Sequence, residues 1–175
     1  MEIVKLHSNL IKPNLPASKT KLFTIPQDDE FEDKSFMESP ALEAVGSLLV
    51  YKTPKFSFLK GVDILYCWKR DGGKTNNKLV LGKIGKINPR ERFLCDDKYQ
   101  FLMWIAADHT RQGQFTEFQM EALVFHELCH LGKMANGEIV LLAHDFEGFA
   151  AELEAYGLWK SDLRQLGFLQ QGKLF

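Results

Sequence analysis

Cysteine is scarce in this chain, and long apolar runs are absent. Its 175 residues include only Cys67, Cys95 and Cys129, which are widely spaced and form no C-x-x-C pair. This pattern argues against a disulfide framework and fits a reducing compartment. No stretch is apolar for long enough to cross a bilayer, and the start, MEIVKLHSNLIKPNLP, lacks the unbroken apolar core of a secretion signal. We therefore expect a cytoplasmic protein with no membrane partner.

A strong net charge is also lacking, because the formal net charge is −1. Overall charge therefore points to neither a nucleic-acid nor a membrane partner. Locally, acidic side chains crowd residues 28–38 and basic side chains crowd residues 69–92. The simpler interpretation is two solvated surfaces. The alternative is a basic lobe at 69–92 that binds an acidic partner or the phosphate backbone of a nucleic acid.

Length and composition favour one folded domain. A hydrophobic content of 45% in 175 residues suffices for one core and is small for two. Residues 1–38 contain three prolines and the acidic run, so we expect a loosely structured, acidic N-terminal arm. We expect residues 39–175 to form the domain.

The first part of this domain is predicted to contain a helix and a hairpin. A helix should begin after Ser39, a good N-cap, and end before Pro54. Residues 61–68 and 78–85 are rich in β-branched, aromatic and aliphatic side chains, and turn-forming residues separate them. This pattern predicts a hairpin with a long, basic tip.

The second part continues with strands and helices. Residues 99–107 favour a third strand by their length and aromatic content. A tight turn and a short strand are predicted around 136–143, and Asp145 can cap a long final helix. The predicted fold class is therefore α+β.

Residues 116–131 carry the clearest local signals. Thr116 and Gln119 match a capping box, the following residues include neither proline nor glycine, and Gly132 is a natural stop. The sequence VFHELCHLG therefore falls in the last two turns of a predicted helix.

This helix contains the pattern His-Glu-x-x-His, formed by His126, Glu127 and His130. Residues four apart project from one face of a helix, so both imidazoles can bind one ion. Glu127 points beside that ion, as suits a carboxylate that takes a proton from water. Two imidazoles and a third ligand would hold Zn²⁺ with one position open. The alternative is two core histidines and a surface glutamate.

The third ligand has four candidates. His144 is favoured, because it lies in a predicted loop and because neutral imidazole is the commonest partner of two others. Glu147, Asp145 and Glu152 remain open as alternatives. Asp145 or Glu147 would otherwise orient a ligand imidazole as a hydrogen-bonding carboxylate.

Three other residues near the motif are assigned structural roles. Cys129 would crowd the open position of the metal, so we expect a buried thiol. His109 follows a strand and is expected on a surface loop. Tyr156 could donate to an oxyanion, but a packed core tyrosine is the favoured interpretation.

Four segments together resemble a known family. They are KLVLGKIGKINPRERF, YQFLMWIAADHT, FTEFQMEALVFHELCH and HDFEGFAAELEAYGLW. In this order they resemble the blocks of the phage metallopeptidase family, whose members are encoded by phages and prophages and are predicted to be zinc peptidases. The resemblance covers roughly residues 41–165 and implies a hydrolase of the host cytoplasm. The site residues it implies are His126, Glu127, His130 and His144.

A more distant similarity is to SprT-like proteases, which act on DNA–protein crosslinks. Their HELCH-type helix is also followed by a loop with a third histidine. There that histidine is commonly followed by glycine, whereas here Asp145 follows it.

The resulting prediction is one zincin-like α+β domain, with a small sheet packed on the active-site helix, that hydrolyses peptide bonds in a protein or peptide substrate. We expect the strand around 100–107 to be the sheet edge that binds an extended substrate by backbone pairing. The alternatives are a zinc-containing binding module that cuts nothing, and a DNA-associated factor acting through residues 69–92.

Overall fold

The computed structural model describes residues 23–94, 96–144 and 149–160. At its centre is a four-stranded sheet in the order β1-β2-β6-β5. Strands β2 and β6 are parallel, whereas β1 and β5 each run antiparallel to their neighbour. The strands are β1 (Phe36–Glu38), β2 (Ile64–Lys69), β5 (Gly82–Lys86) and β6 (Phe101–Ala106).

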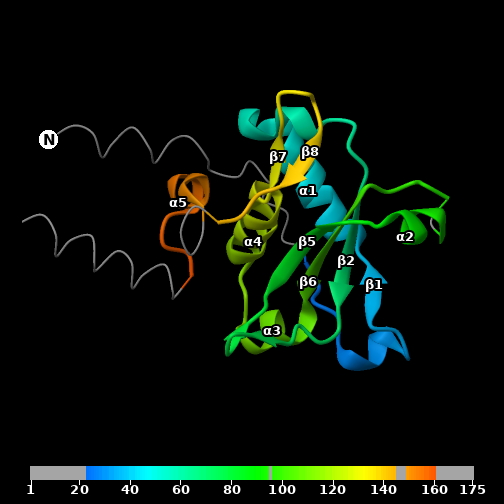
Figure 1. Cartoon of the computed structure of the whole chain (residues 1–175). Helices are drawn as coiled ribbons and strands as arrows, with labels where there is room; N and C mark the ends of the chain where they lie inside the picture. Colours follow the sequence, from blue (N-terminus) through cyan, green and yellow to red (C-terminus); the bar gives the residue numbers. More distant parts are fainter. Residues whose placement is uncertain (1–22, 95, 145–148, 161–175) are drawn as a thin grey trace, which may run out of the picture.

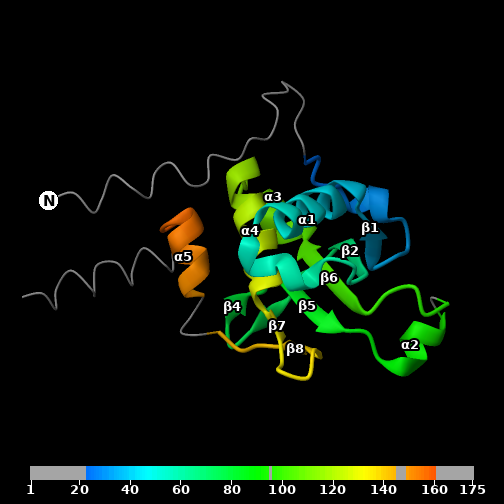
Figure 2. The same ribbon diagram turned by 90° about the horizontal axis from the view of Figure 1, so that it is seen from above.

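Two helices, α1 (Pro40–Lys52) and α4 (Glu117–Cys129), cover one face of this sheet, as Figures 1 and 2 show. The apolar core lies between these helices and the sheet. This mixed arrangement of helices and strands agrees with the predicted α+β class.

Strand β6 forms within the predicted range 99–107, but it occupies the interior of the sheet. It pairs with β2 on one side and with β5 on the other. The expectation that this strand is the substrate-binding edge is therefore wrong, and the edges are β1 and β5. The physical reason is composition: FLMWIA contains no charged residue, and continuous apolar runs are typical of interior strands whose two faces are both covered.

The predicted hairpin of residues 61–68 and 78–85 does not form, because β6 lies between β2 and β5. The turn-forming residues instead close a smaller hairpin of β3 (Lys74–Thr75) and β4 (Lys78–Leu79). Its turn residues Asn76 and Asn77 have φ angles of 50° and 63°. Asparagine tolerates this left-handed conformation, which tight hairpin turns require.

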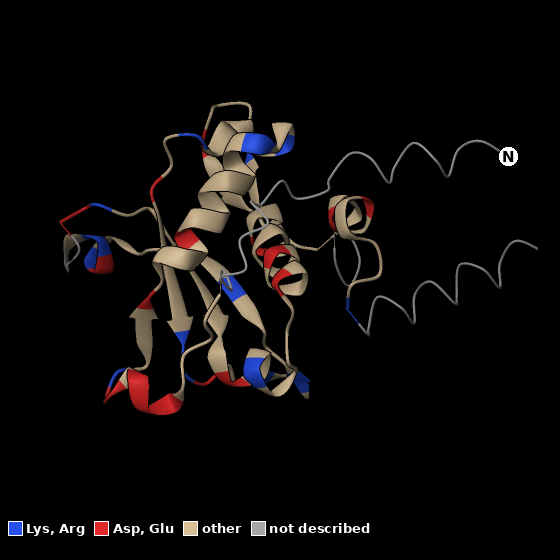
Figure 3. Cartoon of the chain, turned by 180° about the vertical axis from the view of Figure 1, so that it is seen from behind, with Lys and Arg blue, Asp and Glu red and all other residues tan. Residues whose placement is uncertain are grey.

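Part of the expected N-terminal arm belongs to the folded domain. Phe23 and Phe31 are buried in the core, and β1 pairs with β2. Phe31 ends the short 3-10 helix η2 (Asp28–Phe31), whose acidic residues are exposed and are coloured red in Figure 3. A segment of polar average composition can still be held in the core by single large apolar residues, which the average composition does not reveal. Residues 1–22 of the expected arm lie outside the described residues.

Helix α1 forms as predicted. The Ser39 side chain accepts a hydrogen bond from the Leu42 amide at 3.2 Å, and Pro40 follows it. The helix approaches β2 so closely that a Cβ at Gly46 would lie 2.4 Å from the Tyr66 ring. The short helix η3 (Pro54–Leu59) then turns the chain toward the sheet.

Of the remaining elements, β7 (Leu131–Lys133) and α5 (Ala150–Tyr156) pack against α4. The described helices are too short and too polar to cross a membrane. The predicted short strand near residue 139 forms, whereas the final helix begins at Ala150 rather than after Asp145, which lies outside the described residues. The elements that complete the fold are α2 (Pro89–Leu94), α3 (Ala107–Gln112), β7 (Leu131–Lys133), β8 (Ile139–Leu141) and α5 (Ala150–Tyr156).

Candidate metal centre

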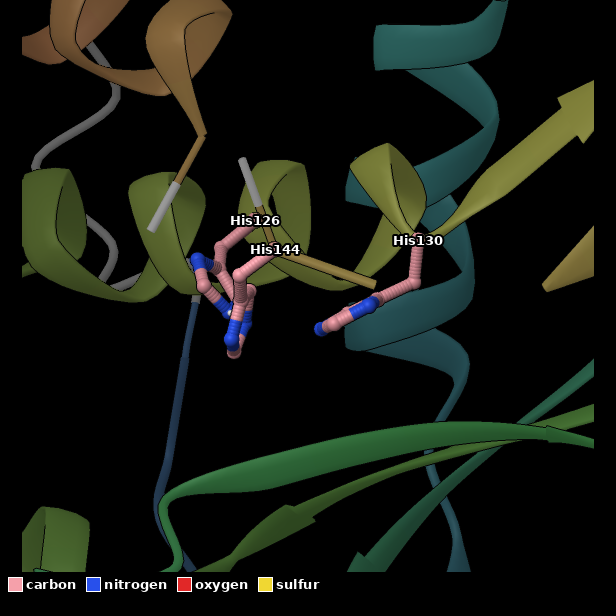
Figure 4. Close-up of side chains that lie close together, drawn as sticks. All are labelled: His126, His130 and His144. Carbon is pink, nitrogen blue, oxygen red and sulfur yellow. Dashed lines mark hydrogen bonds between the residues drawn. The ribbon is translucent and has the colours of Figure 1, made fainter. Parts of the chain in front are cut away.

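Helix α4 holds the two motif histidines on one face. Its capping box forms as predicted: the Thr116 hydroxyl accepts from the Gln119 amide at 3.3 Å, and the Gln119 side chain accepts from the Thr116 amide at 3.0 Å. The helix ends at Cys129, with His130 as the C-cap residue. The ring centroids of His126 and His130 lie 5.3 Å apart, and both rings point toward the sheet (Figure 4).

The β7–β8 hairpin brings His144 to the same place. Strand β7 begins directly after His130, and β8 returns antiparallel to it. Nε2 of His144 consequently lies 3.1 Å from Nε2 of His126. One nitrogen from each of the three rings lies within 4.8 Å of the others. The structure thus brings together the three histidines suggested by the sequence (Figure 4).

Two of these rings are oriented by hydrogen bonds through Nδ1. Nδ1 of His126 donates to the Glu152 carboxylate at 2.6 Å, and Nδ1 of His130 donates to the Leu142 carbonyl at 2.8 Å. When Nδ1 carries the proton, the lone pair of a neutral imidazole resides on Nε2. Both rings therefore present Nε2 as the free ligand atom.

Glu152 serves as a partner of His126 rather than as the third ligand that the sequence left open. It is 1% exposed and also accepts from the Trp159 indole at 2.5 Å and from the Phe149 amide at 3.3 Å. Burial alone would raise the pKa of Glu152, but these donors, led by His126, lower it overall. The ionised carboxylate fixes the ring of His126. The other carboxylates considered for this role, at 145 and 147, lie outside the described residues.

The electrostatic environment favours the neutral form of two of these histidines, His130 and His144. Burial lowers the pKa of His130, and the nearby His126 lowers it further. Burial also lowers the pKa of His144, as do both neighbouring histidines. Since only neutral imidazole can donate its lone pair to a metal, these shifts favour the ligand form of His130 and His144 near neutral pH.

Glu127 links α4 to the edge strand β5. Its side chain is buried and accepts a hydrogen bond from the Ile84 backbone. Burial raises the pKa of Glu127 to about 7, although His126 and the Ile84 bond oppose the shift. A carboxyl group with this pKa can both take and return a proton at neutral pH.

The other three residues near the motif are structural. Cys129 and Tyr156 are buried as expected, and the Tyr156 hydroxyl donates to Glu121 at 2.9 Å. His109 differs from the expected surface loop residue, since it lies buried in α3 with Nδ1 2.9 Å from the Val80 carbonyl. This contact connects α3 to the segment before β5, which lies far from α3 in the sequence.

The three imidazoles fit a zinc ion. Two nitrogens that each lie about 2.1 Å from a tetrahedral zinc are roughly 3.4 Å apart, close to the 3.1 Å between Nε2 of His126 and His144. Neutral imidazole suits this borderline metal, and Cys129 is buried elsewhere in the core. Three protein ligands would leave one tetrahedral position free, as in catalytic rather than structural sites.

Comparison with known proteins gives one result. A family model described as a putative phage metallopeptidase matches residues 34–167. No curated protein and no solved structure matches the chain. The matched range contains α4, the β7–β8 hairpin and α5, and so includes every side chain of the cluster described above.

Proposed function

This chain belongs to the putative phage metallopeptidase family, and on that premise we propose that it is a zinc-dependent, zincin-like peptidase. The observation that carries the proposal is the cluster of three imidazoles within 4.8 Å, formed by His126, His130 and His144. Beside it lies Glu127, a buried acid adjacent in sequence to a ligand. A purely structural zinc site has no use for such an acid, whereas peptide hydrolysis does.

Each side chain then has a defined task. Bound zinc would supply Lewis-acid chemistry, polarising a peptide carbonyl and making water acidic enough to lose a proton near neutral pH. Glu127 accepts that proton at its carboxylate and returns it to the leaving amine. Glu152 and the Leu142 carbonyl keep the ligand rings in place through Nδ1.

Strand β5 offers the surface for an extended substrate. It is an edge strand, paired with β6 on one side only among the described strands. Glu127 contacts this strand at Ile84, so a peptide pairing with β5 would pass close to the proton acceptor. Extended peptides commonly bind sheet edges through backbone hydrogen bonds. We therefore propose β5, in place of β6, as the substrate-binding strand.

A pair of matched glutamates tests the enzyme hypothesis. Glu127 and Glu121 are both buried on α4, but Glu121 bonds Tyr156. Glu127→Gln should lower the rate of cleavage of casein and of the chain itself by about 100-fold or more, because general-base catalysis contributes that much. Glu121→Gln should leave cleavage near the wild-type rate.

Zinc content separates the alternatives. Equal zinc in wild type and Glu127→Gln, with cleavage lost only in the latter, supports the peptidase. Stoichiometric zinc without a difference between these proteins on any substrate would instead indicate a non-catalytic zinc-binding module.

A further inference from the structure

The ring of Phe149 lies against the imidazoles of all three histidines. The ring centroids are 5.3 Å apart for His126, 4.8 Å for His130 and 5.1 Å for His144. The interplanar angles, 64°, 85° and 70°, are those of edge-to-face packing. Phe149 is 2% exposed, so its ring is buried beside the cluster.

The backbone of Phe149 is hydrogen-bonded to the carboxylate that orients His126. Phe149 is the N-cap residue of α5, and its amide donates to the Glu152 carboxylate at 3.3 Å. That carboxylate also accepts from His126. The ring and the main chain of one residue therefore both connect α5 to the histidines on α4.

His144 depends on this contact more than the other two rings do. It is exposed, whereas His126 and His130 are partly buried. Nδ1 of His126 and of His130 each has an acceptor, but no described residue accepts from Nδ1 of His144. Among the described residues, its orientation therefore rests on the contact of its Nε2 with Nε2 of His126 and on ring packing against its neighbours, including Phe149.

Building on the proposed metal site, we propose that Phe149 is a positioning residue that orients the three imidazoles for metal binding. A smaller or flexible side chain would leave space into which the rings can rotate. Ordering them again would then cost free energy when the metal binds. Phe149 would thus affect both the affinity for the metal and the coordination geometry of the bound metal.

The test compares two phenylalanines of equal burial in the full-length chain. Phe149→Leu removes the ring at the cluster, and Phe101→Leu removes an equally buried ring, 2% exposed, at the start of β6. Zinc affinity is measured by competition with a chromophoric chelator. Coordination geometry is measured from the visible absorption of bound Co²⁺, which is strongest for tetrahedral sites. Thermal unfolding of the metal-free proteins shows whether both substitutions cost similar stability.

Phe149→Leu should weaken zinc binding by about 10-fold or more, as loss of supporting residues commonly does, and should weaken the Co²⁺ bands. Phe101→Leu should stay within about twofold of wild type, as expected for a distant site. If Phe149→Leu does not fold, Phe149→Met gives the same comparison with a longer apolar side chain.

Wild-type affinity and an unchanged Co²⁺ spectrum in Phe149→Leu would overturn the inference about Phe149 while leaving the peptidase proposal intact. Equal weakening in Phe101→Leu would also overturn it, because the effect would then be one of general stability. Failure of the wild-type protein to bind zinc would overturn both proposals.

Discussion

Adding one methyl group at Gly82 should displace the proposed proton acceptor while leaving the metal ligands in place. A Cβ on this residue of β5 would lie 2.9 Å from Oε1 of Glu127 and 2.9 Å from Cδ1 of Ile105. Ordinary contact begins at 3.4 Å, so each of these two atoms must move by roughly half an ångström. Ile105 and Glu127 are both buried, so the substitution displaces the Glu127 carboxylate together with the Ile105 side chain.

The expected consequence of Gly82→Ala is a loss of turnover. Misplacement of a catalytic group by an ångström can cost about 100-fold in rate, so kcat/KM should fall by about 10- to 100-fold. Overpacking should reduce the free energy of unfolding by about 1–3 kcal/mol. Zinc affinity should not change, because the substitution contacts none of the three histidines. Peptide hydrolysis, zinc competition and urea unfolding measure these quantities separately.

Gly85 provides the matched control on the same strand. A Cβ at this position would meet nothing within 4 Å, so Gly85→Ala should retain wild-type turnover and stability. Peptide hydrolysis by Gly82→Ala as fast as by Gly85→Ala would refute this prediction, and so would a loss of activity fully explained by lost zinc.

Two further substitutions test the support of α4. Glu152→Gln should weaken zinc binding by about 10- to 100-fold, because the amide holds His126 less strongly than a carboxylate; the exposed Glu154→Gln is the control, and equal affinities would count against this role. Tyr156→Phe should lower the free energy of unfolding by about 1–3 kcal/mol, because buried Glu121 loses its hydrogen-bond donor. Burial raises the pKa of Glu121 and the bond from Tyr156 opposes this, so the substitution raises it further. A raised pKa favours folding in acid and lowers stability as pH rises through it, so urea unfolding should show a larger loss at about pH 8 than at about pH 5. A loss independent of pH would contradict that account.

Local signals in the sequence predicted the elements that depend on neighbouring residues. The Ser39 cap of α1 and the Thr116–Gln119 box of α4 both form, because each is a hydrogen bond between residues three apart. The spacing of His126 and His130 placed both on one helical face for the same reason.

Such local signals do not predict which strands pair when the strands are far apart in the sequence. Strand β6 inserts between β2 and β5, and nothing in either flanking segment encodes the later strand. The turn residues between them suggested a single hairpin, although they close only β3 and β4.

The role of Glu152 could have been anticipated from helical spacing. It lies three residues after the apolar Phe149 and four before Tyr156, which was predicted to be a packed core residue. A carboxylate on that buried face requires partners, and a nearby histidine of the motif is a natural one. The contacts of Phe149 with three rings, by contrast, depend on how α5 packs on α4, which spacing does not determine.

Metal content is the most direct test of the central claim that three histidines form a zinc site served by Glu127. Wild-type protein and Glu127→Gln, purified without chelator, should each contain one zinc ion per chain by elemental analysis, with peptide cleavage in wild type alone. Absence of bound metal from both proteins, or equal cleavage by both, would contradict the account.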